Sequence, residues 1–131
     1  MTTPELRAHE TYAAGLPETA QPLYLALGEQ LVAGLPQAEV RVWHGAPVWF
    51  DQGEPLVGLT LTRRGVQLLF WSGQLFDEPG LRATGNFKAS ERLYQAIADI
   101  EPADLQRWLA KALSIKWDYA GELKKRRERA G

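Results

Sequence analysis

The sequence has 131 residues, 45% of them hydrophobic and 24% charged, with a net charge of −1 and no cysteine. This composition fits one globular domain with its own core and excludes a disordered or fibrous chain. The missing cysteines exclude disulfides, thiol catalysis and thiolate metal sites. We therefore expect residues 1–131 to form a single domain with a short basic C-terminal tail, residues 121–131.

Two helices are predicted before the first strand. The first follows Pro4, a residue suited to the first turn, and runs to about Ala14. The second begins near Thr19 as N-cap and ends at Gly34. Its apolar positions recur every four residues, which predicts an amphipathic helix facing a core: Leu23, Leu27 and Leu31.

From Val40 onward the apolar residues alternate, which is typical of strands. Gly45 and Pro47 interrupt the first such stretch, so two short strands are expected there. Segments 56–62 and 66–71 are rich in strand-forming residues and flank a glycine-containing turn, so we expect an antiparallel hairpin. The second of them is almost continuously apolar and predicts a central strand covered on both faces.

The C-terminal half contains a long irregular segment and a helix. Residues 72–88 have a loop composition, and residues 89–97 fit either a helix or a brief extended strand. A final helix is predicted from Pro102 to about Tyr119, with Trp108 on its buried face.

Four motifs in order, at residues 43–50, 70–73, 84–88 and 115–119, resemble the YdhG-like family, also called domain of unknown function 1801. The resemblance covers roughly residues 10–120. It implies an α+β fold with an antiparallel sheet of about five strands, covered on one side by N- and C-terminal helices. One family member is described as a frataxin-like intracellular iron chaperone, and most members have no assigned activity.

The aromatic residues around the first motif suggest a ligand pocket with segment 72–88 as a lid. The candidate ligand-binding residues are Trp43, His44, Trp49, Trp71 and Lys88. Lys88 is included because the family usually has Thr-Gly-Lys where this chain has Thr84-Gly85-Asn86, and Lys88 could replace that lysine. The alternative is that the tryptophans only pack in the core.

A metal site has weaker support, because two histidines and scattered acids form no dense set of ligands. Iron could still bind through surface carboxylates, as the resemblance implies for an iron chaperone. The candidates are Asp51, Glu54, Asp77 and Glu78, and the alternative is that these turn acids are simply solvated. No other cofactor is expected.

Catalysis is the minority expectation, since no nucleophile–base pair can be named and His44 is the one well-placed base. An enzyme using His44 as general base stays a second alternative. The basic tail is a weak argument for nucleic-acid binding, because the rest of the chain carries a net negative charge that would oppose contact with phosphates. We expect a cytoplasmic binding or carrier domain for a small molecule or metal ion, with no membrane partner. The sequence does not determine the oligomeric state.

Overall fold

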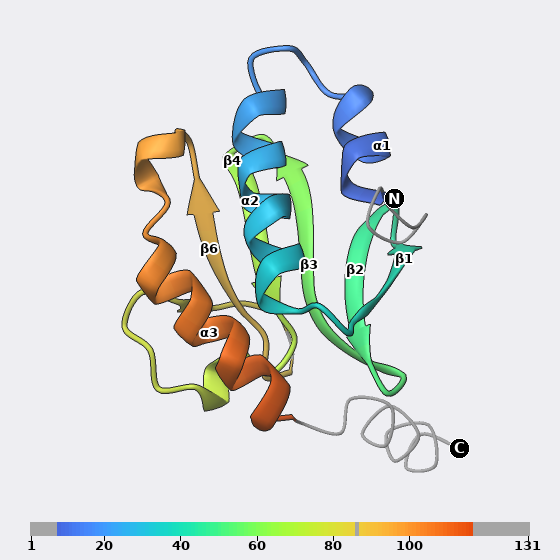
Figure 1. Ribbon diagram of the computed structural model, residues 1–131. Coiled ribbons are helices and arrows are strands. Elements are labelled where there is room, and N and C mark those ends of the chain that lie inside the picture. Colours follow the sequence, from blue (N-terminus) through green and yellow to red (C-terminus); the bar gives the residue numbers. More distant parts are fainter. Residues whose placement is uncertain (1–7, 86, 117–131) are drawn as a thin grey trace, which may run out of the picture.

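The computed structural model describes residues 8–85 and 87–116, which form an α+β fold (Figure 1). Its α-helices are α1 (Ala8–Ala14), α2 (Gln21–Gly34) and α3 (Pro102–Ser114). Its strands are β1 (Glu39–Trp43), β2 (Ala46–Asp51), β3 (Glu54–Thr62), β4 (Gly65–Phe70), β5 (Arg82–Ala83) and β6 (Ser90–Tyr94). Short 3₁₀ turns lie at Gly73–Leu75 and Ile97–Asp99. None of the described helices is long and apolar enough to cross a membrane.

The six strands of the described chain form one antiparallel sheet in the order β1-β2-β3-β4-β6-β5. About five strands were expected, and the additional one is the two-residue β5, which the long loop contributes. The predicted hairpin is confirmed as β3–β4, with Leu59 opposite Leu68. Residues 89–97 also contain a strand, β6, so the extended alternative is correct there.

Two tight turns set the register of the first three strands. His44 and Gly45 (φ 55° and 83°) join β1 to β2, and Gln52 and Gly53 (φ 52° and 82°) join β2 to β3. Two successive positive φ angles are the signature of the two-residue hairpin turn whose twist matches the sheet. The first turn therefore lies one residue earlier than the sequence suggested, and Pro47 already belongs to β2.

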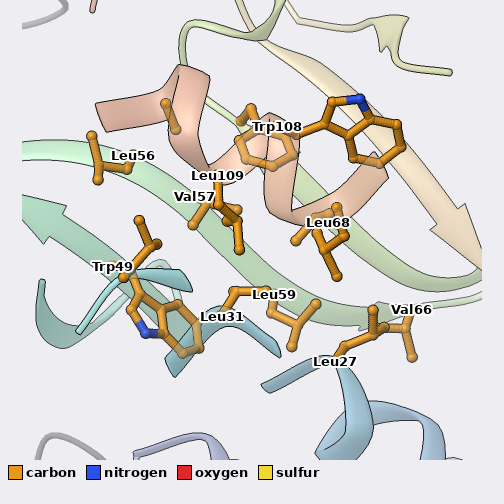
Figure 2. Packing of buried hydrophobic residues seen from close by; sticks show 14 of the residues in the cluster. Leu27, Leu31, Trp49, Leu56, Val57, Leu59, Val66, Leu68, Trp108 and Leu109 are labelled. Atoms are coloured by element: carbon orange, nitrogen blue, oxygen red, sulfur yellow. The ribbon is translucent and has the colours of Figure 1, made fainter. Parts of the chain in front are cut away.

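The helices cover one face of the sheet and bury the core against it (Figure 1). Leu27 and Leu31 of α2 and Leu109 of α3 lie over Val57, Leu59 and Leu68 (Figure 2). The predicted leucine stripe of α2 is buried as expected, and Trp108 is only 4% exposed.

Two tyrosine hydroxyls complete the backbone hydrogen bonds of β3 where β2 leaves it. The last β2–β3 pair in this direction is Val48 with Gly58. Beyond it, the Tyr24 hydroxyl donates to the Leu59 carbonyl at 2.7 Å, and the Leu61 N–H donates to the Tyr12 hydroxyl at 3.2 Å. Buried backbone groups need such partners, so α1 and α2 help to stabilise this part of the sheet.

Two sequence predictions were wrong, one about the extent of the last helix and one about the burial of β4. The last helix ends at Ser114, whose hydroxyl lies 3.4 Å from the carbonyl oxygens of Ala110 and Lys111, and Ile115 is extended. The predicted end at Tyr119 and the basic tail lie outside the described residues. Strand β4 is central but not covered equally on both faces, because buried residues alternate along it with partly exposed ones such as Leu69.

Candidate functional site

The face of the sheet opposite the helices carries a cross-strand row that runs through all six strands. Its members are paired in register from the β1 edge to the β5 edge: Arg41, Val48, Gly58, Leu69, Glu91 and Arg82. No helix of the described chain covers this face (Figure 1). The middle of the row is apolar and its β5 end is charged.

Two tryptophans lie over the middle of this row. The rings of Trp43, at the end of β1, and Trp71, just after β4, are stacked with centroids 5.7 Å apart and planes 25° apart. Gly58 lies beneath Trp71, since a Cβ at this glycine would lie 3.1 Å from the indole carbon Cζ3. The missing side chain thus allows the indole to lie flat against the sheet, which is the close backbone approach that a strand glycine often marks.

Two adjoining hollows flank these rings, and together we call them the open-face groove. One has a cavity volume of about 160 Å³, and its lining includes Trp43, Val48 and Gly58. The other, of about 250 Å³, is bounded by Thr84 and Phe87, which follow β5. Both are lined by His44, Leu69 and Trp71.

His44 lies at the mouth of the open-face groove. It is exposed at the β1–β2 turn, and its ring centroid lies 4.4 Å from that of Trp43. A positive φ is uncommon for a residue with a side chain, although histidine tolerates it better than most. The turn therefore holds a group that can donate or accept a hydrogen bond beside an apolar wall.

Two residues proposed for the pocket do not line the open-face groove. Trp49 is 1% exposed and belongs to the core on the helical face (Figure 2). The alternation of side chains along β2 explains this. Trp43 pairs with Ala46 and shares its face, and Trp49, three residues after Ala46, therefore lies on the opposite face. Lys88 is exposed and absent from the lining of both hollows.

A buried carboxylate at the β5 end of the row escaped the sequence analysis. The Glu91 side chain is 2% exposed, and it accepts hydrogen bonds from Arg82 at 2.7 Å, Arg64 at 3.3 Å and Gln67 at 2.9 Å. Burial pushes its pKa upward, but the Arg82 and Gln67 hydrogen bonds and the two arginine charges outweigh it and hold the pKa below its ordinary value. Glu91 lies in the polar run Ser90-Glu91-Arg92, which has no apolar pattern that would indicate a buried position, so its burial was not predicted.

Of the four acids proposed as iron ligands, two are paired with cations, one is exposed, and Glu54, opposite Asp51 in the sheet, has one buried oxygen with no hydrogen-bond partner among the described residues. Glu78 accepts bonds from Arg107 at 2.7 Å, Lys111 at 2.6 Å and the Trp108 indole at 2.9 Å. The Arg107 and Lys111 hydrogen bonds hold its pKa far below the ordinary value. Asp51 is hydrogen-bonded to Lys116, and Asp77 is an exposed turn residue at φ 57°.

One group of the described residues does bring metal-ligating atoms together, and it is a different one. Ligand atoms of His9, Glu10 and Glu29 lie within 4.8 Å of one another, with His9 Nε2 3.2 Å from a Glu29 oxygen. His9 is 1% exposed and fits because Gly28 has no side chain, since a Cβ there would lie 2.3 Å from its ring. Neither Glu54 nor any other acid proposed from the sequence belongs to this group.

The comparisons with known proteins support the fold. No family model matches the sequence, and no curated protein matches it. The structure is similar to the crystal structure of a Bacillus subtilis protein of the domain of unknown function 1801 family, YdhG. The match has a TM-score of 0.66 and 11% sequence identity, and it covers 87% of this chain and 94% of the other. The α+β architecture expected from the resemblance is thereby confirmed, and at this identity the likeness extends to the fold alone.

Proposed function

We propose that this protein binds a small molecule that contains a planar apolar group, and that the open-face groove is the binding site. The observation that carries this proposal is the convergence of Trp43 and His44, at the β1–β2 turn, with Trp71, just after β4, on a sheet face that no described helix covers. Ligand sites are typically apolar hollows with a few polar groups that fix orientation. Non-covalent binding or transport fits this composition better than catalysis.

The stacking of the two tryptophans limits how a ligand can bind. A ring inserted between two parallel aromatic rings needs about 7 Å between them, twice the usual stacking separation of about 3.5 Å. The centroids of Trp43 and Trp71 are 5.7 Å apart, so no ring fits between them. The ligand therefore lies along the two hollows, against Leu69 and the exposed side of the indoles, where offset or edge-on aromatic contacts are favourable.

The groove limits ligand size as well. Its two hollows, of about 160 Å³ and 250 Å³, suit one or two fused rings with a short substituent. Thr84 and Phe87 form one wall, and His44 offers one hydrogen bond at the mouth. We infer that specificity comes from shape and from one or two polar contacts.

A thermal-shift screen of aromatic metabolites tests the proposal, because a ligand that binds only the folded state raises the melting temperature. A genuine ligand should stabilise the wild-type protein and lose most of this effect in Trp71→Ala. The matched control is Val42→Ala, which removes an apolar side chain that is 69% exposed on β1 and absent from the lining of both hollows. Equal stabilisation of wild type and Trp71→Ala would place the site elsewhere.

A second candidate function is binding of a divalent metal ion at His9, Glu10 and Glu29. The favouring observation is that one imidazole nitrogen and two carboxylates lie within 4.8 Å of one another, a donor set that suits zinc or ferrous iron. Titration with Fe(II), Zn(II) and Co(II) should raise the melting temperature of the wild type, and Glu29→Gln should abolish the rise. An unchanged rise in Glu29→Gln would exclude this group as the site.

A further inference from the structure

The β5 end of the cross-strand row, beside the open-face groove, has an excess of positive charge. Two guanidinium groups, Arg64 and Arg82, share the single carboxylate of Glu91. The three ionised groups therefore sum to one net positive charge. The arginine side chains are 55% and 66% exposed, whereas the Glu91 side chain is 2% exposed. The carboxylate is thus covered, and the cations face the solvent.

Each guanidinium retains donors for another partner. Among the described residues, the Arg82 and Arg64 side chains make one hydrogen bond each, both through Nη2 to the same oxygen of Glu91. A guanidinium carries five N–H donors in a planar fork. The second Glu91 oxygen accepts from Gln67, so the carboxylate is fixed from both sides and restricts the positions of the two cations. A fixed fork suits planar or tetrahedral anions, which arginine binds with two parallel hydrogen bonds.

The cations are also at a suitable distance from the apolar hollows. Leu69 lines both hollows and lies directly opposite Glu91, which lies opposite Arg82. Adjacent strands are about 4.8 Å apart, so the backbone at Arg82 is about 10 Å from that at Leu69. The Arg82 guanidinium reaches back across β6 to Glu91, whose second oxygen accepts a hydrogen bond from Gln67, and Gln67 lines the first hollow. Thr84, which lines the second hollow, directly follows β5 and is two residues from Arg82 along the chain.

We propose that the ligand of the open-face groove is an aromatic anion, with its ring against Leu69 and Trp71 and its carboxylate or phosphate on Arg82 and Arg64. This inference rests on the proposed function, because it assumes that the groove is the site. Glu91 acts as a positioning residue that holds both guanidinium groups at the rim. A carboxylate and a phosphate share the chemistry that the arginine pair recognises, so the experiment contains an arm for each.

The experiment compares probes that differ in charge but keep the same ring. The carboxylate arm uses 2-naphthoate against the neutral 2-naphthamide, and the phosphate arm uses adenosine 5′-monophosphate against adenosine. Dissociation constants are measured by calorimetry at low salt with wild type, Arg82→Gln and Arg63→Gln. Arg63 is the matched control, an exposed arginine of the β3–β4 turn that lines neither hollow.

In at least one arm the charged probe should bind the wild type about tenfold more tightly than its neutral partner, the effect of a charge-assisted hydrogen bond at a partly exposed site. Arg82→Gln should reduce this ratio to near one and leave the affinity of the neutral probe unchanged. Arg63→Gln should leave the ratio as it is. The compensated double variant Arg82→Gln/Glu91→Gln, which leaves no unpaired buried carboxylate, should behave like Arg82→Gln and guards against a folding defect.

Three outcomes overturn the inference, and the first two separate it from the proposed function. Binding of both probes of each pair with equal affinity would show a groove that ignores charge, and the proposed function would survive. A preference for the charged probes that persists in Arg82→Gln and in the double variant would place the anion elsewhere. If no probe, charged or neutral, binds the wild type, both the inference and the aromatic groove as a ligand site fail together.

Discussion

The Trp71 indole lies in the space that a side chain at Gly58 would fill, because a Cβ on the glycine would lie 3.1 Å from the indole ring. The glycine is a strand residue in the middle of the sheet, where glycine is unfavourable because it packs nothing and loses more entropy on folding. Its presence is explained by the indole that lies over it. The open-face groove depends on this pair, since Trp71 lines both of its hollows.

The first prediction concerns this contact. Gly58→Val should push the Trp71 ring out of position and weaken binding of 2-naphthamide at least tenfold, measured by calorimetry. The variant should also lose about 1–3 kcal/mol of unfolding free energy, the usual cost of overpacking. Gly15→Ala is the control, because a Cβ there meets only an ordinary contact at 3.6 Å. Unchanged affinity in Gly58→Val would mean that the ligand does not use this groove.

The second prediction concerns His44. His44→Asn removes the imidazole but keeps a residue that tolerates the positive φ of the turn. Ligand affinity should fall severalfold, while the free energy of unfolding should stay within about 1 kcal/mol of the wild-type value, as for a surface substitution. Urea denaturation and calorimetry give the two quantities. A large loss of stability with unchanged binding would assign His44 a structural role.

The third prediction concerns Trp108, whose ring packs edge-on against Phe70 with centroids 6.3 Å apart. Trp108→Ala should cost roughly 3–5 kcal/mol in urea denaturation, the range for truncating a core aromatic. The same variant also removes the indole N–H bonded to Glu78. Leu113→Ala, on the exposed side of the same helix, should cost far less. A loss below about 1 kcal/mol for Trp108→Ala would contradict the packing of Trp108 against Phe70 in the core.

The fourth prediction is a pH dependence that originates at Glu78. Its pKa is lowered in the folded protein by the Arg107 and Lys111 hydrogen bonds. Such a group stabilises the fold above its unfolded pKa of about 4.3, and this contribution disappears as the pH falls toward the folded pKa. The difference in unfolding free energy between wild type and Glu78→Gln should therefore be larger at pH 7 than at pH 3.

Urea denaturation at the two pH values measures this difference, and the contribution of Glu91 cancels because both proteins contain it. Asp77→Asn, at the exposed neighbouring acid, should show a smaller change with pH. If the difference in unfolding free energy between wild type and Glu78→Gln is equal at pH 7 and pH 3, the ion pairs of Glu78 do not produce the predicted pH dependence.

The sequence predicted the elements of the fold better than the faces of its strands. Local patterns were sufficient for α2, for the β3–β4 hairpin and for the buried side of α3. Which tryptophans share a face depends on where each turn lies. If the turn lies around Pro47, as the sequence suggests, both Trp43 and Trp49 are candidates for the groove. With the two-residue turn at His44–Gly45, alternation places Trp49 in the core.

Other parts of the site depend on contacts between distant residues. Glu91, Arg64 and Arg82 come from three separate segments, and only the strand order β4-β6-β5 brings them together. The contact between His9 and Glu29 also joins distant residues. Gly28, inside α2, leaves room for the imidazole, but a glycine in a helix does not by itself identify the residue that fills this space. Pairing of this kind is set by tertiary structure and leaves no periodic pattern.

The most direct test of the central claim follows the indole N–H resonances of ¹⁵N-labelled protein while a panel of aromatic carboxylates and their neutral amides is added. Trp43 and Trp71 border the open-face groove, whereas Trp49 and Trp108 are buried on the opposite face, at 1% and 4% exposure. Single tryptophan substitutions assign each signal. We predict that bound probes shift the signals of Trp43 and Trp71 and leave those of Trp49 and Trp108 unchanged. A panel that shifts neither Trp43 nor Trp71 at millimolar concentration would contradict the assignment of this face as a ligand site.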